Sequence, residues 1–284
     1  MQIQGMSVNY IYEPREGAET VLFLHGWNAP FEIYRPLLDY LRQNGFGIAA
    51  FDCPGVGKTS QPAAPLTLDD YVSFALEFCR DLGIESAILF AHSNGGRIAL
   101  RLMSDKNCPL ACTKAVLMDA AGAPTPKTLR QKTSLRLYKC LRVLGTAPVL
   151  RSLFSELYES VRDRRSSADY REASPVMKKT MSNLLACDLT GVMPDITAEV
   201  LLIWGENDTA TPLSEGKRWN LSSKTRVLPP SRGRDTTPIS TIRGSFTLCW
   251  MPFYEVNYGY YHSCFVRAAL SVADTQAVHT SFPA

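Results

Sequence analysis

The stretch that most constrains the fold of this 284-residue chain runs from Ser86 to Leu100. The apolar run at 87–90 predicts a short buried strand, and the pattern at 97–100 predicts a helix. Between them, the sequence AHSNGG places small residues on both sides of Ser93, as a tight strand-to-helix turn requires. Such a turn lifts the Ser93 hydroxyl clear of the strand ends. It directs the hydroxyl toward the amino terminus of the helix, where backbone N–H groups stabilise negative charge.

Short apolar runs alternate with amphipathic ones through the first half of the chain. The predicted strands are Val8–Tyr12, Val21–Leu24, Gly47–Phe51, Ala87–Phe90 and Ala115–Met118. The predicted helices are Phe31–Arg42, Leu66–Leu82 with Thr67 as its N-cap, and the helix that follows Ser93. Strands and helices in this order predict an α/β fold, with a mainly parallel sheet covered by helices on both faces.

Composition narrows the class of protein. The length suits one large domain, or one domain with an insert. Eight scattered cysteines form no Cys-x-x-Cys pair, so we expect reduced thiols rather than a disulfide frame or a zinc site. A net charge of +3 gives no argument for nucleic acid. The amino terminus lacks a secretory pattern, and no apolar run could span a bilayer. We therefore expect a cytoplasmic protein without a membrane span.

Polar residues follow several of the predicted strands at the point where each strand ends. His25-Gly26-Trp27 follows the second strand, a segment from Asp52 to Thr59 follows the third, and Ser93 follows the fourth. A later strand, 200–204, runs into Gly205-Glu206-Asn207-Asp208. Because sites in such sheets lie beyond the carboxyl ends of the strands, these residues are expected at one edge. Asp208 stands where the acid of a catalytic triad would sit.

Four motifs together resemble the α/β-hydrolase superfamily over roughly residues 1–228: HGW at 25–27, DCPGVGKT at 52–59, HSNGGR at 92–97 and LLIWGENDTATP at 201–212. The resemblance implies the α/β-hydrolase fold, with Ser93 as nucleophile and Asp208 as the acid that orients a histidine. It also implies an oxyanion hole made by the backbone N–H groups of Trp27 and Asn94. A neutral serine hydroxyl is a poor nucleophile, so it needs an adjacent base and preorganised donors for the oxyanion.

Ser93 and Asp208 also have a structural interpretation. Ser93 would then serve only as a small residue in the turn, and Asp208 only as a cap of its loop. His25 and His92 are expected to be structural and to bond within their loops, and Asp52 to stabilise its turn. A serine at position 93 disfavours dehalogenase and epoxide hydrolase activities, which would require an aspartate there.

A phosphate-binding loop at Gly57-Lys58-Thr59 is rejected. The pattern needs a glycine five residues before Gly57, and that position is Asp52, whose carboxylate would repel phosphate. We accordingly expect no nucleotide, metal or other cofactor.

Between Ala121 and Thr197 the rhythm of strands stops. The predicted helices there are Thr128–Leu144, Val149–Arg162 and Pro175–Leu185. The resemblance implies that this insert is a helical cap whose inner face largely sets the choice of substrate. Its first part is basic, through Lys127, Arg130, Lys132, Arg136, Lys139 and Arg142. We expect a solvated helix face; a preference for acidic substrates or for a membrane surface is the alternative.

The usual catalytic base is missing from its expected place. After Asp208, a helix at Ser214–Leu221 and a strand at Thr225–Leu228 lead to the point where the family has Gly-x-Gly-His. The segment that follows contains no histidine before His262. The predicted division is therefore a hydrolase core at 1–121 and 198–231, a cap at 122–197, and an atypical tail at 232–284.

A different reading frame supplies a histidine at that place. Reading from the third base of the Arg232 codon permits GAGHYAYLDNPWKFHTVLDAFL followed by a stop, and the step across Asp235–Thr236 must give His or Tyr. We hypothesise that a one-base slip near 229–232 replaced the original ending. A gene with no Gly-His in another frame would exclude this. In the rival interpretation His262 reaches back as the base; His279 is a weaker candidate.

These observations predict a serine-nucleophile hydrolase that acts on a small, largely apolar ester or related acyl substrate. Ser93 would attack, an acyl-enzyme would form, and water would release the product. Without the histidine, the activity of this chain is expected to be impaired. The alternative from another class is a non-catalytic hydrolase-fold protein that binds a small ligand under its cap. Lyase or cofactor-free perhydrolase chemistry also stays open, and the oligomeric state is not predicted.

Overall fold

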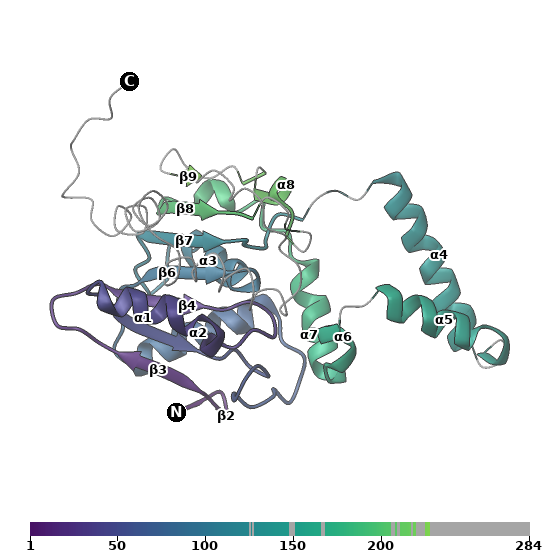
Figure 1. Cartoon of the computed structure of the whole chain (residues 1–284), viewed down its shortest axis with the longest axis horizontal. Helices are drawn as coiled ribbons and strands as arrows, with labels where there is room; N and C mark the ends of the chain where they lie inside the picture. Colours follow the sequence, from purple (N-terminus) through teal and green to yellow (C-terminus); the bar gives the residue numbers. More distant parts are fainter. Residues whose placement is uncertain are drawn as a thin grey trace, which may run out of the picture.

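The fold is built on a twisted sheet (Figure 1). A computed structural model describes residues 1–124, 126, 128–147, 151–165, 168–205, 208, 211–216, 218–219 and 225–227. Within them the main sheet has seven strands in the order β3-β5-β4-β6-β7-β8-β9. They are β3 (Tyr10–Glu13), β4 (Thr20–Leu24), β5 (Gly47–Phe51), β6 (Ile88–His92), β7 (Lys114–Met118), β8 (Glu199–Ile203) and β9 (Thr225–Val227).

All neighbouring strands of this sheet are parallel except β3, which is antiparallel to β5. A separate antiparallel pair joins β1 (Gln2–Ile3) and β2 (Met6–Ser7). The mainly parallel sheet expected from the sequence is thus confirmed.

Most helices match the expected ones, but the helix expected at 214–221 is shorter: it ends at Gly216, and residues 218–219 are not helical. The helices are η1 (Phe31–Tyr34), α1 (Arg35–Gln43), α2 (Leu68–Asp81), α3 (Asn94–Ser104), α4 (Leu129–Thr146), α5 (Arg151–Arg165), α6 (Ala168–Glu172), α7 (Pro175–Ala186), η2 (Met193–Asp195) and α8 (Leu213–Gly216). The single helix expected at 31–42 is instead a 3-10 turn followed by α1. Pro36 lacks an N–H, and it occupies the first turn of α1, where no intrahelical bond is lost. Thr67 caps α2 in a reciprocal capping box with Asp70.

The sheet buries a separate apolar cluster on each face. Successive strand residues point to opposite faces, and β4 shows the division: Leu22 packs in a cluster with Phe74 of α2 and Ile98 of α3. Its neighbour Phe23 packs in the other cluster, with Leu38 of α1. Helices therefore cover both faces of the sheet, as expected.

Four helices, α4 to α7, lie between β7 and β8. The last of them packs on the body: Thr180 Oγ1 accepts a hydrogen bond from Leu66 N (3.0 Å), and Asn183 Nδ2 donates to Leu66 O (3.0 Å). By contrast, α4 and α5 form a hairpin that projects away from the body (Figure 1). The helices expected in this segment are confirmed, with α6 in addition. The cap role and the domain boundaries stay predictions, and the tail at 232–284 lies outside the described residues. No helix in the described ranges is both long enough and apolar enough to cross a bilayer.

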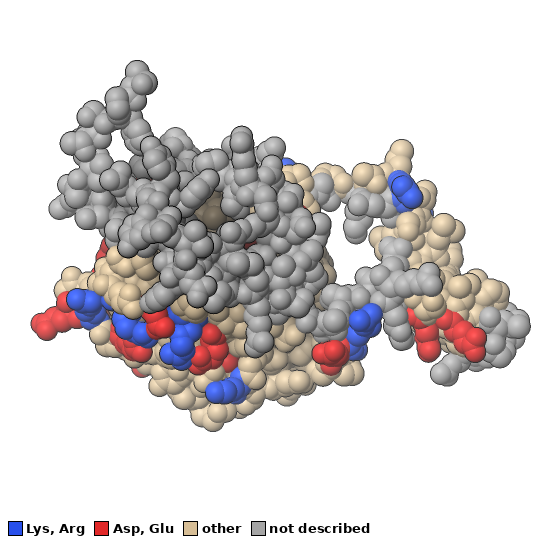
Figure 2. Space-filling view, in the orientation of Figure 1, with Lys and Arg blue, Asp and Glu red and all other residues tan. Residues whose placement is uncertain are grey.

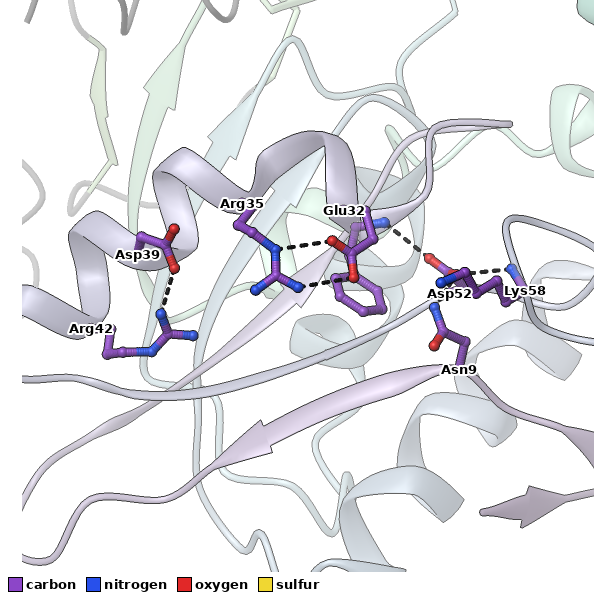
Figure 3. A network of polar contacts seen from close by, with 8 residues as sticks. Asn9, Glu32, Arg35, Asp39, Arg42, Asp52 and Lys58 are labelled. Atoms are coloured by element: carbon purple, nitrogen blue, oxygen red, sulfur yellow. Dashed lines mark hydrogen bonds and ion pairs between the residues drawn. The ribbon is translucent and has the colours of Figure 1, made fainter. Parts of the chain in front are cut away.

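Asp52 ties three parts of the body together (Figure 3). Its side chain is fully buried. Oδ1 accepts from Phe31 N (3.0 Å), and Oδ2 accepts from Asn9 Nδ2 (2.7 Å) and Lys58 N (3.1 Å). A Cβ at Gly57 would lie 2.2 Å from Oδ2, so the loop closes directly on the carboxylate. The turn-stabilising role expected for Asp52 is confirmed.

Replacing this carboxylate should be costly. Asp52→Ala leaves three N–H donors without their acceptor, of which that of Phe31 is buried and the other two are partly buried. We therefore expect a loss of about 3 kcal/mol in the free energy of unfolding. Glu32→Ala is the matched control, because the Glu32–Arg35 pair is about half exposed and should contribute under about 1 kcal/mol. Urea denaturation measures both. Equal losses in the two variants would contradict this assignment.

Candidate active site

The strand-to-helix turn forms at Ser93, between β6 and α3. Ser93 has φ 48° and ψ −113°, a left-handed conformation that costs roughly 1–3 kcal/mol for a residue with a side chain. Its N–H donates to Met118 O (3.0 Å), and its carbonyl accepts from Ala121 N (2.9 Å) and Gly96 N (3.0 Å). The strained residue is therefore fixed by the end of β7 and the loop beyond it.

Glycines allow the turn to sit against its neighbours. A Cβ at Gly95 would lie 2.1 Å from Leu24 O, and one at Gly96 would lie 2.4 Å from Ala120 Cβ. A Cβ at Gly26 would lie 3.3 Å from Ser93 Cβ. The HGW loop after β4, the start of α3 and the loop after β7 therefore meet at Ser93.

The two expected oxyanion donors flank this point. Trp27 directly follows Gly26 and is half-buried, and Asn94 is the first residue of α3 and 9% exposed. The first N–H groups of a helix have no acceptor within the helix and carry its positive dipole end. An anion beside Ser93 would be stabilised there; that these N–H groups act as an oxyanion hole stays a prediction.

Asp208 lies beyond β8, at the same edge of the sheet. It is half-buried, and its Oδ1 accepts from Thr211 N (2.9 Å) while its Oδ2 accepts from Thr211 Oγ1 (2.9 Å). These are the bonds of a loop cap, so the contacts fit the structural alternative as well as the triad acid. Its role stays a prediction.

Asp119 is a second carboxylate at this edge, and the sequence analysis missed it. It follows β7 directly, has φ 43°, and accepts a hydrogen bond from Gly205 N (2.7 Å). The pKa of Asp119 is raised to about 7, mainly by burial; the hydrogen bond from Gly205 N opposes the rise, and charge repulsion and a hydrogen bond with Asp208 add to it. A polar residue directly after a predicted strand was the signal; it was used for four strands but not for 115–118.

Backbone hydrogen bonds connect these loops in the order of the strands. Ser93 bonds to the end of β7, Asp119 N donates to Ile203 O (2.9 Å), and the Asp119 side chain accepts from the backbone after β8. Since β7 lies between β6 and β8, Ser93 and Asp208 follow strands whose axes are about 10 Å apart. The structure thus brings Trp27, Ser93, Asn94 and Asp208 to one edge of the sheet.

The two described histidines are committed elsewhere. His25 Nδ1 donates to Gly26 O (2.6 Å) and its Nε2 accepts from Cys53 N (2.8 Å). His92 Nδ1 lies 2.8 Å from the Tyr34 hydroxyl. Burial lowers both pKa values, that of His92 to about 4, with a further contribution from His25. Their structural role is confirmed, although the partner of His92 comes from η1 rather than from its own loop. His262 and His279 lie outside the described residues.

No metal site is formed in the part of the chain that the structure describes, since no three His, Cys, Asp or Glu side chains gather there. The described cysteines are free thiols: Cys53, Cys79, Cys108, Cys112, Cys140 and Cys187. The Gly57–Thr59 loop faces the Asp52 carboxylate, and Thr59 Oγ1 accepts from Asn9 N (3.0 Å).

Comparisons with known proteins agree on the fold. A family model for the alpha/beta hydrolase fold matches residues 19–233. An uncharacterized hydrolase of Bacillus subtilis (strain 168), YugF, is 24% identical over 238 residues, which cover 80% of this chain and 86% of that protein. The enol-lactonase from Burkholderia xenovorans LB400 has a TM-score of 0.60 and 18% identity, covering 88% of this chain and 97% of that one.

A shorter match is closer in sequence. The dihydrolipoyllysine-residue acetyltransferase component of the acetoin cleaving system of Cupriavidus necator is 36% identical over 103 residues, or 36% of this chain. The chain spans only 27% of the length of that relative.

Filling the contact at Gly95 should disrupt the turn. Alanine normally stabilises a helix over glycine by about 1 kcal/mol, but at Gly95 its Cβ would meet the Leu24 carbonyl. We expect Gly95→Ala to lower the free energy of unfolding by about 3 kcal/mol. Gly191→Ala, where the added Cβ meets open space, is the control and should change it little. Chemical denaturation of both variants tests this; a neutral or stabilised Gly95→Ala would contradict it.

Asp119 should make stability fall as pH rises. Its pKa is near 3.8 in an unfolded chain and about 7 in the folded protein, so the folded state binds the proton more tightly. Stability is then full below about pH 4 and declines as pH rises through 7. Asp119→Asn keeps an acceptor for Gly205 N–H and removes this decline. Relative to the wild type, we expect the variant to gain about 2 kcal/mol between about pH 5 and about pH 8. Parallel stability–pH curves would exclude the protonated Asp119.

Proposed function

The chain belongs to the α/β-hydrolase family, and on that premise we propose that it is a serine-nucleophile hydrolase of a small, largely apolar ester or related acyl substrate. Its relatives and structural neighbours include hydrolases and esterases. The observation that carries the proposal is the backbone of Ser93, which is held in a strained conformation between β6 and α3. Strain of this kind persists where the surroundings over-determine it, and such places are commonly functional sites.

The proposed reaction begins with attack of Ser93 Oγ on the acyl carbon. The oxyanion that forms would be stabilised by the N–H groups of Asn94 and Trp27, which act without reorganisation because the helix start and the HGW loop are fixed by their neighbours. The leaving group departs, an acyl-enzyme remains, and water releases the acid. Asp208 would orient the histidine that serves as base.

Neither of the two described histidines can act as the general base of this reaction. His25 and His92 are buried and bonded to other groups, so neither ring is available to take the proton of Ser93. An imidazole must therefore come from the chain after β9. If the one-base slip inferred from the sequence is correct, that imidazole was lost with the original ending and the activity of this chain is impaired.

Within the segment between β7 and β8, α7 and the residues just after it are proposed to cover the site and to select the substrate, while the α4–α5 hairpin projects away from the body. Two contacts support this: Leu189 N donates to Gly122 O (2.8 Å), and Arg97 of α3 donates to Cys187 O (3.1 Å). A Cβ at Gly55, in the loop after β5, would lie 2.5 Å from Met177 Sδ of α7. A buried methionine close to the carboxyl edge favours an apolar substrate over a charged one.

A non-catalytic ligand-binding protein is the second candidate. The observation that favours it is that both described histidines are buried and hydrogen-bonded to other groups. In that case the site would keep its shape and bind a small molecule without cleaving it.

Restoring the ending separates the two candidates. We expect the chain itself to hydrolyse a p-nitrophenyl ester no faster than Ser93→Ala. Replacing residues 232–284 with the sequence encoded by the other frame should raise the rate about a thousandfold. Ser93→Ala in the restored protein should abolish the gain, and so should a substitution of the restored histidine. Fluorophosphonate should label Ser93 in the restored protein, and should label neither the unmodified chain nor the Ser93→Ala variant to a comparable extent.

Two results would contradict the proposal. A restored protein that folds but shows no Ser93-dependent rate would favour the ligand-binding alternative. A Ser93-dependent rate in the unmodified chain that is lost in His262→Ala would identify His262 as the base and overturn the impairment.

A further inference from the structure

In the hairpin of α4 and α5, the inner faces of the two helices pack against each other. The rings of Tyr138 and Tyr158 lie 5.9 Å apart between centroids. Gly145 lets the two helices approach, because a Cβ there would lie 2.6 Å from Tyr158 Cβ and 3.1 Å from Phe154 O. The extensive contacts of α4 are with α5, and Figure 1 shows the hairpin standing away from the sheet and its helices. Its outer face is therefore presented to the surroundings.

Large apolar side chains lie on the outer face of α4. Leu129 is 80% exposed, Leu137 71% and Val143 61%. At 3.6 residues per turn these three fall within one sector of about 120°, on the side away from Tyr138, and the exposed Arg136 falls in the same sector. Single exposed leucines are ordinary on a protein surface, but an aligned set on a projecting helix marks an interaction surface. We call these three residues the α4 apolar stripe.

Positive charge surrounds the α4 apolar stripe. The basic residues of α4 are all exposed: Arg130, Lys132, Arg136, Lys139 and Arg142. No acidic residue occurs in α4. By sequence, residues 129–165 carry nine Lys or Arg and three Asp or Glu, a net charge of +6 in a chain whose net charge is +3. Positive charge is thus concentrated in the hairpin, while the rest of the chain is net negative. In Figure 2, Lys or Arg stands at the upper end of α4, and Asp or Glu lies on α5.

We propose that the outer face of α4 docks on an anionic lipid surface. The outer face of α4 carries exposed apolar side chains interspersed with Lys and Arg. In a membrane interface the apolar side chains can lie among the acyl chains, while the long basic side chains, Arg136 included, reach the anionic headgroups. This inference is independent of the proposed reaction, since it uses no residue of the candidate active site. It places the hairpin on the membrane, with the net-negative remainder of the chain turned away from the like-charged surface.

Other occupants fit the face less well. In a symmetric dimer the same patch would meet itself, and two α4 faces would bring like charges together. Nucleic acid would satisfy the cations but leave the α4 apolar stripe in water. A lipid surface satisfies both features at once.

Co-sedimentation of the full chain with lipid vesicles tests the proposal. We expect about tenfold more binding to phosphatidylcholine vesicles containing about 30% phosphatidylglycerol than to phosphatidylcholine alone, and a marked fall in binding at high salt. Two separate triple variants should each reduce binding to the anionic vesicles about tenfold or more. They are Leu129→Ser/Leu137→Ser/Val143→Ser and Lys132→Glu/Arg136→Glu/Lys139→Glu.

Matched controls place the changes elsewhere on the exposed surface. Leu185→Ser, at a leucine 58% exposed on α7, should leave binding unchanged. So should Arg15→Glu/Lys106→Glu/Lys179→Glu, which makes the same change in charge outside the hairpin. Circular dichroism checks that each variant is folded.

Three outcomes would overturn the proposal. Binding to neither kind of vesicle is the first, and binding that neither hairpin variant reduces is the second. The third is a dimer in solution that the serine variant dissociates, which would assign the α4 apolar stripe to a second copy of the chain.

Discussion

The hydrogen bonds that hold the backbone of Ser93 are the constraint on which the site depends. A serine with positive φ is unfavourable by itself, and it persists here because its N–H and its carbonyl are both bonded to the loop around β7. Gly95 and Gly96 then let α3 begin in contact with the ends of β4 and β7. The shape of the turn at Ser93 therefore comes from backbone contacts with neighbouring strands and the loops that follow them. That backbone positions the side chains of Ser93, Asn94 and Trp27.

Asp52 and Asp119 show how the same type of side chain has different roles at one edge of the sheet. Asp52 accepts three N–H bonds and closes the loop after β5 around itself. Asp119 accepts one backbone N–H and shares a hydrogen bond with Asp208, so burial and the second carboxyl group favour its proton. The loops after β7 and β8 are consequently joined through a group that titrates near neutrality.

Much of this arrangement could be predicted from the sequence, because the strands are short, apolar and separated by clear helical periodicity. All five residues of β5 are buried, and such a strand can be read from its apolar run alone. Pro36 marks the break between η1 and α1 in the sequence, because proline favours the first turn of a helix. Asp119 carries the same signal as the polar residues after the other strands, since it directly follows the apolar run 115–118, but it belongs to none of the four motifs of the resemblance. The projection of α4 could not be predicted, since Leu135, Tyr138 and Leu141 on one side and the α4 apolar stripe on the other give no single amphipathic face.

His25 and His92 form structural hydrogen bonds, so the bend at Ser93 can form without a histidine that is free to act as base. Within the described residues, the contacts that form the bend at Ser93 are made by β4, β7, α3 and their loops, so the bend has its own support without an imidazole. A gene of this family can therefore forfeit its reaction in one step while its product still folds. If the one-base slip is correct, the strained turn outlasts the reaction that it was shaped to support.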